Sequence, residues 1–261
     1  NANNLEIVQA IIRAAEAEHS PVILQASQGA IGYAGLDYIV AMVRVAAEKA
    51  KVPVVLHLDH GKDFAEVMRC IRSGFSSVMV DGSALPLEGN IELTNRVVDV
   101  ARAVGVSVEA ELGRIGGTED NVSVSEREAA MTDPQEALRF VQDTEVDALA
   151  VAIGTAHGQY KGKPELDFER LKKIRELVNV PIVLHGSSGV PDEDIRKAIQ
   201  LGVRKVNIDT NLREAFVYKM REVLAEKPKE IDPRKILGPA RDALQEVVQQ
   251  KIRLFGSSNK A

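Results

Sequence analysis

The chain has 261 residues, of which 45% are hydrophobic and 27% are charged, and its single cysteine, Cys70, cannot form an intrachain disulfide. This composition excludes a disordered tail, a collagen-like fibre and a disulfide-stapled scaffold, and it predicts a globular protein of a reducing cytoplasm. The formal net charge of -5 is not gathered into long runs, and no apolar run reaches the ~18 residues of a membrane span. We therefore expect neither a nucleic acid nor a membrane as partner.

Seven short β-branched segments bounded by Gly, Pro or Asp predict strands. They cover residues 21–27, 53–59, 76–81, 104–112, 147–154, 180–186 and 202–209. Amphipathic segments with helical periodicity alternate with them, at residues 5–18, 36–51, 64–73, 90–103, 134–144, 168–177 and 192–201. The alternation, together with nearly continuous apolar strands, indicates an α/β fold with a buried parallel sheet.

An eight-stranded (β/α)8 TIM barrel needs one strand more than these seven. The chain opens on Asn1-Ala-Asn-Asn directly before a helical segment and lacks an initiating Met, so we expect the first strand to precede residue 1. Two helices are predicted after the last strand, at residues 211–226 and 239–255, joined by residues 227–234. No linker is visible. We therefore predict one barrel domain over residues 1–261, with C-terminal helices from about residue 211 onward.

Polar residues gather at the C-terminal ends of the predicted strands, the rim that carries the active site of a barrel. The set comprises Gln25, Ser27, Asp59, His60, Asp81, Glu109, Glu111, His157, His185, Asn207 and Asp209. Three of the chain's five histidines, His60, His157 and His185, belong to it, and each is followed by glycine. Three imidazoles leave a zinc ion one open coordination position, so this pattern predicts a catalytic zinc site.

The neighbours of these histidines indicate how the site is built. Strict alternation would point Asp59 and His60 to opposite faces, so we expect the chain to begin its turn at His60, which Gly61 permits. Glu109 and Glu111 share one strand face and need a cation or hydrogen-bond partners. They either support or bind a metal, or they pair with an interior base such as Lys205. His57 either lies behind the site or fills the core.

Two segments after the last strands offer backbone N–H groups to a phosphate. They are Gly186-Ser-Ser-Gly189 and Asn207-Ile-Asp209-Thr210-Asn211, the second of which opens a helix. Residues 113–120, rich in glycine, predict a mobile loop that carries the carboxylate of Glu119 over the metal.

Over its whole length the chain resembles the class II, metal-dependent fructose-bisphosphate and tagatose-bisphosphate aldolases. The motifs that carry the resemblance are Leu58-Asp-His-Gly61, Val108-Glu-Ala-Glu-Leu-Gly113, Gly116-Gly-Thr-Glu-Asp120, Ala152-Ile-Gly-Thr-Ala-His-Gly158, Leu184-His-Gly-Ser-Ser-Gly189, Val206-Asn-Ile-Asp-Thr210 and Asp232-Pro-Arg234. One position departs from the pattern, because Ala84 stands where many relatives have His. The family has the barrel inferred above, including a strand before residue 1.

The resemblance implies a role for each matching residue. His60, His157 and His185 would hold Zn²⁺, with Glu111 at an alternative metal position. Asp59 would handle the proton on the oxygen formed from the aldehyde, and Glu119 would remove a proton from dihydroxyacetone phosphate. The implied substrate contacts are Asn1, Gln25, Ser27, Gly158, Gly186, Ser188, Asn207, Asp209 and Thr210, with Arg234 reaching the other phosphate from a neighbouring subunit. A homo-oligomer (dimer or tetramer) and a monovalent cation, Na⁺ or K⁺, are implied as well.

The activity implied is reversible cleavage of fructose 1,6-bisphosphate to dihydroxyacetone phosphate and glyceraldehyde 3-phosphate, as in glycolysis and gluconeogenesis. The Asn-Ile-Asp-Thr motif at residues 207–210 favours fructose over the alternative, tagatose 1,6-bisphosphate. A Schiff-base aldolase using Lys205 would leave the three rim histidines unexplained. A non-catalytic sugar-phosphate sensor on the same barrel is the remaining alternative, since a fold does not determine a function.

Overall fold

The computed structural model describes residues 1–119, 122–124, 130–160, 162 and 164–261, and the side chains of residues 118, 119 and 122–124 lie outside the described part. The chain divides into two compact units. The first consists of Asn1–Ala26, Ala30–Leu56 and Asp209–Ala261, and the second of Ser27–Gly29 and His57–Ile208.

A sheet of seven strands has the order β1-β2-β3-β4-β7-β9-β10. The strands are β1 (Val22–Ser27), β2 (Val54–Gly61), β3 (Ser77–Val80), β4 (Ser107–Leu112), β7 (Ala148–Val151), β9 (Ile182–Leu184) and β10 (Val203–Val206). From β2 to β10 every neighbouring pair is parallel. The α/β fold with its seven predicted strands is thus confirmed. Inside the second unit, Met79, Ala150 and Val183 from three of these strands form a buried apolar cluster.

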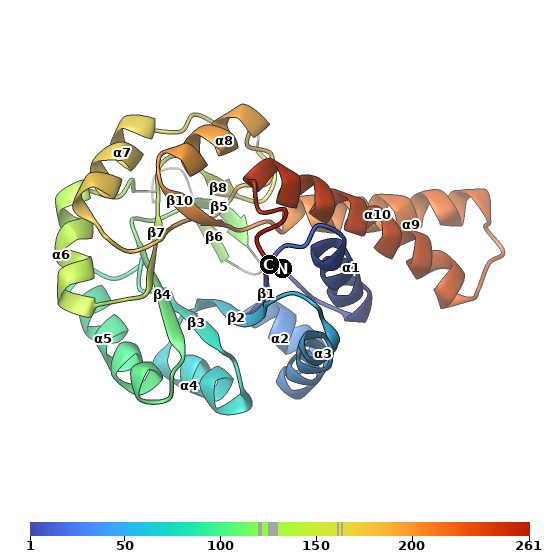
Figure 1. The fold of residues 1–261 in the computed structure, drawn as a ribbon, viewed down its shortest axis with the longest axis horizontal. Coiled ribbons are helices and arrows are strands. Elements are labelled where there is room, and N and C mark those ends of the chain that lie inside the picture. Colours follow the sequence, from blue (N-terminus) through green and yellow to red (C-terminus); the bar gives the residue numbers. More distant parts are fainter. Residues whose placement is uncertain (120–121, 125–129, 161, 163) are drawn as a thin grey trace. The chain divides into compact units, whose positions relative to one another are not determined.

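Helices alternate with the strands of the second unit and lie around their outer side (Figure 1). They are α4 (Phe64–Ser73), α5 (Leu87–Ala103), α6 (Pro134–Thr144), α7 (Phe168–Leu177) and α8 (Asp192–Gln200). Aspartates begin three of them, because the side chains of Asp63, Asp133 and Asp167 accept N–H groups of the first turn. Each of these helices has a buried apolar side, on which Phe140 and Ile174, for example, are fully buried. This arrangement leaves the strand ends open to carry polar residues.

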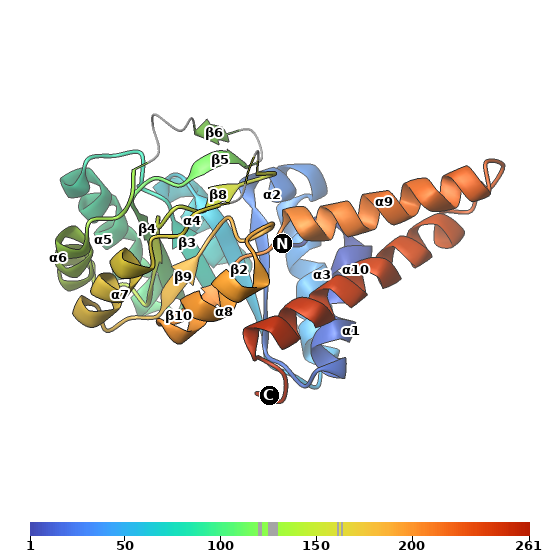
Figure 2. The ribbon, with the colours of Figure 1, turned by 90° about the horizontal axis from the view of Figure 1, so that it is seen from above.

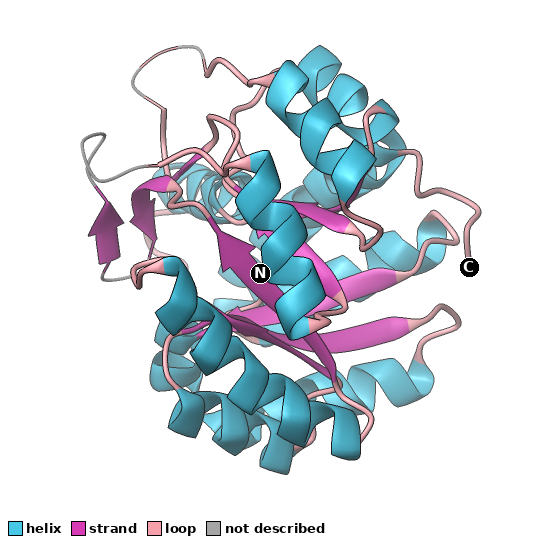
Figure 3. Cartoon of the chain, turned by 90° about the vertical axis from the view of Figure 1, so that its left-hand side faces the viewer, coloured by secondary structure: helices cyan, strands magenta, loops and turns pink. Residues whose placement is uncertain are grey.

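A second, three-stranded sheet has the order β6-β5-β8, with β5 (Gly116–Glu119), β6 (Val122–Val124) and β8 (Ala156–His157). Figure 2 shows these strands side by side beyond one end of the large sheet, and Figure 3 draws the strands of the chain in magenta. β5 pairs antiparallel with β6 and parallel with β8. The prediction of a loop over residues 113–120 is therefore wrong for residues 116–119. Strands this short carry no readable periodicity.

The first unit holds α1 (Leu5–Ala17), most of α2 (Gln28–Ala34), α3 (Leu36–Lys49), α9 (Thr210–Glu226) and α10 (Pro233–Phe255). α9 and α10 run antiparallel against each other (Figure 2). The predicted start of the last helix at residue 239 is wrong: Asp232 accepts the N–H of Arg234, Pro233 occupies the first turn, and Pro239 lies inside the helix. Among the described residues no single helix is long and apolar enough to cross a membrane; the bent pair α2 and α3 together meets those criteria by length and composition.

Candidate active site

The end of β2 turns two neighbouring side chains to the same side of the second unit. His60 has a φ of 48°, and the register between β2 and β3 shifts between Leu58 and Gly61. The chain therefore bends at His60, as predicted, although the left-handed residue is His60 itself. Gly61 serves a different need, because a Cβ there would lie 2.6 Å from the carbonyl oxygen of Met79. The bend explains how Asp59 and His60 are both buried, with Asn207 beside Asp59 and His185 beside His60.

The three predicted histidines converge. His60 is the second-last residue of β2, His157 ends β8 and His185 directly follows β9. Their ring centroids lie 4.7 Å to 5.9 Å apart, and one nitrogen of each lies within 4.8 Å of the others. Nε2 of His60 and Nδ1 of His185 lie 3.0 Å apart.

Two carboxylates determine which nitrogen carries the proton in the rings of His60 and His185. Asp81 Oδ2 lies 2.9 Å from Nδ1 of His60, and Glu109 Oε1 lies 2.8 Å from Nε2 of His185. A carboxylate accepts a proton, so each of these nitrogens carries the N–H and the other nitrogen of the ring carries the lone pair. Nε2 of His60 and Nδ1 of His185 consequently face each other as two lone pairs, an arrangement that suits a cation between them.

Glu109 and Glu111, which share a face of β4 as predicted, have different partners. Oε2 of Glu109 lies 2.8 Å from Nζ of Lys205 and 3.7 Å from Nε2 of His57. Glu111 Oε2 lies 3.8 Å from Nδ1 of His60. One glutamate thus meets the interior lysine, as one of the two alternatives predicted, and the other lies beside a histidine of the candidate metal site.

Burial would raise the pKa of Glu109, but the positive charge of Lys205 and the hydrogen bond from His185 outweigh it and hold the pKa well below its usual range. The carboxylate therefore stays ionised inside the unit. Lys205 also donates to Oδ1 of Asn207 over 2.8 Å, and Nδ2 of Asn207 lies 3.4 Å from Oδ1 of Asp59. A continuous polar chain thus links β4, β10 and β2.

Asp81 has a role that the sequence did not assign. It follows β3 and, besides His60, accepts hydrogen bonds from the backbone N–H and the hydroxyl of Ser83. Burial would raise its pKa, but the hydrogen bond from His60 and the donors of Ser83 hold that pKa below its usual range. His60, Asp81 and Glu111 form a second group whose ligand atoms lie within 4.8 Å of one another. In the sequence, the one sign of this role was the position of Asp81 at a strand end, and several other carboxylates have such a position too.

The predicted substrate-binding residues divide between the two units. Ser27, Gly158, Gly186, Ser188 and Asn207 belong to the second unit with the histidines, whereas Asn1, Gln25, Asp209, Thr210 and Arg234 belong to the first. In the first unit, Gln25 donates to Oδ1 of Asn1 over 2.8 Å. The backbone of Glu119 ends β5. Its side chain, assigned as the base, lies outside the described residues.

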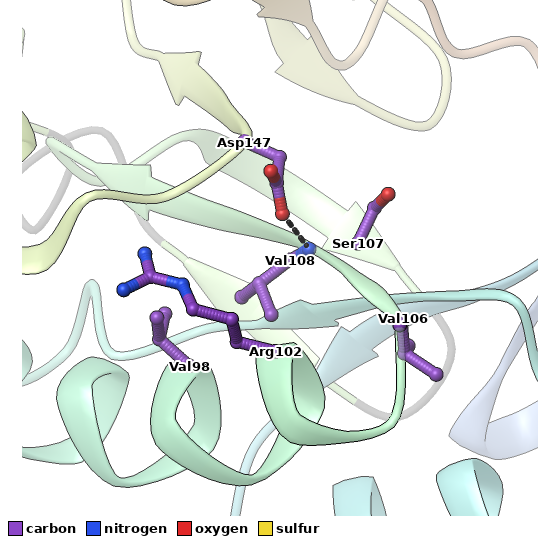
Figure 4. Close-up of a pocket in the computed structure, with 7 residues that line it drawn as sticks. Val98, Arg102, Val106, Ser107, Val108 and Asp147 are labelled. Carbon is purple, nitrogen blue, oxygen red and sulfur yellow. Dashed lines mark hydrogen bonds between the residues drawn. The ribbon is translucent and has the colours of Figure 1, made fainter.

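A surface pocket of about 190 Å³ lies at the other ends of the strands (Figure 4). Ser107 and Val108 begin β4 there, and Asp147 precedes β7. The carboxylate of Asp147 accepts the backbone N–H of Val108 over 2.7 Å, which stabilises the entry into the strand. None of the candidate site residues lines this pocket, so we place no chemistry in it.

The three-histidine set fits a divalent metal with imidazole ligands. Zn–N bonds of about 2.0–2.1 Å separate two nitrogens of a tetrahedral site by about 3.4 Å, close to the 3.0 Å between Nε2 of His60 and Nδ1 of His185. Each of these two rings gives its other N–H to a carboxylate, the usual support of a metal-bound histidine. The geometry therefore supports a metal centre, and the comparison with known proteins assigns its family.

The family model of class II fructose-bisphosphate aldolase matches residues 1–260. The chain belongs to the class II fructose-bisphosphate aldolase family. Within this aldolase family, it is 49% identical to the fructose-bisphosphate aldolase of Thermus caldophilus, covering 100% of this chain and 93% of that protein. It is 46% identical to the sulfofructosephosphate aldolase of Alkalicoccus urumqiensis, covering 100% and 91%. The crystal structure of the YdjI aldolase from Escherichia coli K12 superposes with a TM-score of 0.86 at 38% identity, covering 100% and 91%. The resemblance inferred from the motifs is confirmed.

Proposed function

We propose that the chain catalyses reversible aldol cleavage of fructose 1,6-bisphosphate to dihydroxyacetone phosphate and glyceraldehyde 3-phosphate. The observation that carries the proposal is the convergence of His60, His157 and His185, with two of the rings oriented by the carboxylates of Asp81 and Glu109. Family membership gives the reaction class. The fructose-bisphosphate aldolase of Thermus caldophilus, at 49% identity, supports the choice of substrate.

The three histidines would hold Zn²⁺, since neutral imidazoles are good zinc ligands. The metal would act as a Lewis acid that polarises the ketone of the substrate. His60 is held for this role by Asp81, and His185 by Glu109. Glu111, 3.8 Å from Nδ1 of His60, would serve an alternative metal position with that histidine.

The proton transfers would be carried out by two carboxylates. In the synthetic direction, Glu119 takes a proton from the carbon next to the ketone of dihydroxyacetone phosphate, and that carbon then bonds to the aldehyde carbon of glyceraldehyde 3-phosphate. Asp59 gives a proton to the former aldehyde oxygen. Asp59 is fully buried and lies within 3.4 Å of the amide of Asn207, which Lys205 orients. Cleavage runs through the same steps in reverse.

Phosphate binding would use backbone groups beside the histidines and side chains of the first unit. Gly158 and Gly186 follow metal ligands directly and have φ values of 84° and 61°, which orient the N–H groups of the next turn. We propose that Ser188 and Asn207 act with them, and that the other contacts are Asn1, Gln25, Ser27, Asp209, Thr210 and, from a neighbouring subunit, Arg234. A Na⁺ or K⁺ ion beside the phosphate completes this proposal.

The seven parallel strands would belong to a (β/α)8 barrel, and residues 1–261 would act as one barrel domain. The superposition on the YdjI aldolase, with a TM-score of 0.86, supports this. The enzyme would be a cytoplasmic dimer or tetramer that acts on sugar phosphates and not on nucleic acids or membranes.

Chelation tests the central claim. Cleavage of fructose 1,6-bisphosphate should be lost after treatment with a chelator and restored by Zn²⁺, while borohydride should trap no substrate on Lys205. Full turnover by metal-free protein, or covalent trapping on Lys205, would exclude the metal-dependent mechanism. Binding of the bisphosphate without turnover by the metal-loaded protein would favour the sensor instead.

Substrate choice needs its own comparison, because one relative at 46% identity is named a sulfofructosephosphate aldolase. We expect kcat/KM to be highest for fructose 1,6-bisphosphate among three ketoses, the others being tagatose 1,6-bisphosphate and a ketose phosphate bearing a sulfo group. A higher kcat/KM for either of the other two would mean that this ketose is the preferred substrate, and the reaction would still be an aldol cleavage.

A further inference from the structure

The hydroxyl of Tyr160 lies between the two segments that carry His157 and His185. It accepts the backbone N–H of Ala156 over 2.7 Å and donates to the carbonyl oxygen of Gly186 over 2.8 Å. Ala156 directly precedes His157, and Gly186 directly follows His185. We propose that Tyr160 is a positioning residue whose hydroxyl sets the spacing of these two metal ligands.

The backbones that Tyr160 joins are already in close contact. A Cβ on Gly186 would lie 2.6 Å from the carbonyl oxygen of Ala156, and the φ of Gly186 is 61°. A Cβ on Gly189 would lie 3.2 Å from the ring of Tyr160. The ring therefore rests against the turn after His185 while its hydroxyl joins the two backbones. A small change in this spacing is transmitted directly to His157 and His185.

The same arrangement extends to the strand that leads to the proposed base. β8 pairs with β5 in parallel, with Gly116 opposite Ala156 and Gly117 opposite His157. A Cβ on Gly117 would overlap the carbonyl oxygen of His157, so the two strands are also in close contact here. One edge of β8 thus pairs with the strand that ends at Glu119, and the backbone N–H of Ala156 donates to Tyr160. If the proposed function is correct, Tyr160 also positions the backbone that carries the base.

The phenol suits a dual hydrogen-bonding role. Burial raises the pKa of Tyr160, and the N–H of Ala156 only partly offsets this, so the hydroxyl keeps its proton. It therefore donates to one segment and accepts from the other at the same time. Phenylalanine would keep the ring against Gly189 while leaving the amide of Ala156 and the carbonyl of Gly186 without this partner.

The test compares Tyr160→Phe with Tyr33→Phe, which removes the hydroxyl of a tyrosine that is 80% exposed. Zinc affinity is measured by competition with a chelator, without substrate. We expect about 10-fold weaker binding for Tyr160→Phe, as for other supports of metal ligands, and no change for Tyr33→Phe. Hydrogen exchange at the Ala156 amide should also accelerate by about 10-fold, since that amide loses its acceptor. Wild-type values for both quantities in Tyr160→Phe would overturn the proposal.

Two further measurements distinguish a wrong role for Tyr160 from misfolding of the variant and from a wrong proposed function. If Tyr160→Phe does not fold, exchange at the Ala156 amide is measured in the wild-type protein, where protection supports the hydrogen bond and an unprotected rate overturns the proposal. If the zinc-loaded wild type cleaves no bisphosphate, the proposed function fails while the effect of Tyr160 on zinc affinity still stands or falls alone. At saturating zinc, kcat of Tyr160→Phe should fall by about 10-fold, with KM nearly unchanged, if β5 is positioned as inferred.

Discussion

Oε1 of Glu109 lies 2.8 Å from Nε2 of His185, and this contact determines which nitrogen of that imidazole faces the other histidines. The second oxygen of Glu109 is held by Lys205 at 2.8 Å, so the carboxylate is fixed at both ends. A buried, ionised carboxylate with a lysine partner is the strongest acceptor available for the N–H of His185. The metal-binding capacity of His185 therefore depends on residues that do not touch the metal position.

Glu109→Gln should weaken zinc binding by about 10- to 100-fold, the range seen for partners that support metal-bound histidines. The amide would still offer one oxygen to His185, but its NH₂ group would face the ammonium of Lys205 at the position now held by a carboxylate oxygen. Chelator competition measures the affinity. Glu92→Gln, at an exposed position of α5, is the matched control and should bind as the wild type does. Unchanged affinity in Glu109→Gln would show that the tautomer of His185 is set by another group.

The convergence of the histidines could be predicted because parallel strands bring their C-terminal ends to one side, whatever the details of the loops. The hydrogen-bond partners of the histidine rings could not be predicted in this way. Alternation places Glu109 and Glu111 on one face of β4, but which of them meets His185 and which lies near His60 depends on β2, β9 and β10, far away in sequence. Pairing of β5 with β8 is likewise a non-local contact between segments of two to four residues, too short to show a period.

Because His57 is buried, we expect the free energy of unfolding to depend on pH. Burial and, next to it, the positive charge of Lys205 lower the pKa of His57 to about 3, against opposing effects of Glu109 and Asp59. Between about pH 6.5 and pH 3 the unfolded chain binds a proton at this residue and the folded chain does not. The contribution of neutral His57 is therefore complete above about pH 6.5 and is lost as the pH falls, at about 1.4 kcal/mol per pH unit.

Urea unfolding of metal-free protein between pH 7 and pH 4, followed by circular dichroism, measures this slope. His57→Gln should make the free energy of unfolding fall less steeply with decreasing pH, by about 1.4 kcal/mol per unit, because one proton fewer is taken up on unfolding. His19→Gln, which changes an exposed histidine after α1, should keep the wild-type slope. The same slope in the His57 variant would mean that other groups dominate the acid sensitivity.

Arg234 offers a test of the distal phosphate contact. Its side chain is 89% exposed in this chain, where the guanidinium pairs with Asp232. If it reaches a phosphate from a neighbouring subunit, Arg234→Ala should weaken binding of the bisphosphate by about 10- to 100-fold, the range of a charge-assisted contact, and leave dihydroxyacetone phosphate unaffected. Calorimetric titration with both ligands makes the comparison. Lys235→Ala, next to it, is the control for a general loss of positive charge. Equal losses for both ligands would refute the assignment.

The two proposed proton-transfer residues should fail in different ways. Exchange of the dihydroxyacetone phosphate proton with solvent needs the base alone and no aldehyde, so Glu119→Gln should abolish both exchange and cleavage. Asp59 would act only on the aldehyde half. Asp59→Asn should therefore stop cleavage and leave measurable exchange, followed by loss of the proton signal in D₂O.

The zinc content of these variants must be measured before their exchange rates are compared, because Asp59 is fully buried directly beside His60 and close to Asn207. Removing its charge can weaken metal binding and imitate a chemical defect, so exchange is compared only between samples with equal zinc. Glu119→Asp provides the conservative counterpart: it keeps the carboxylate but shortens its reach, so exchange should be slow and not absent. If Glu119→Gln exchanges the proton at the wild-type rate, Glu119 is not the base. Glu111, 3.8 Å from Nδ1 of His60, would then be the better candidate, whereas Glu109 is occupied by Lys205 and His185.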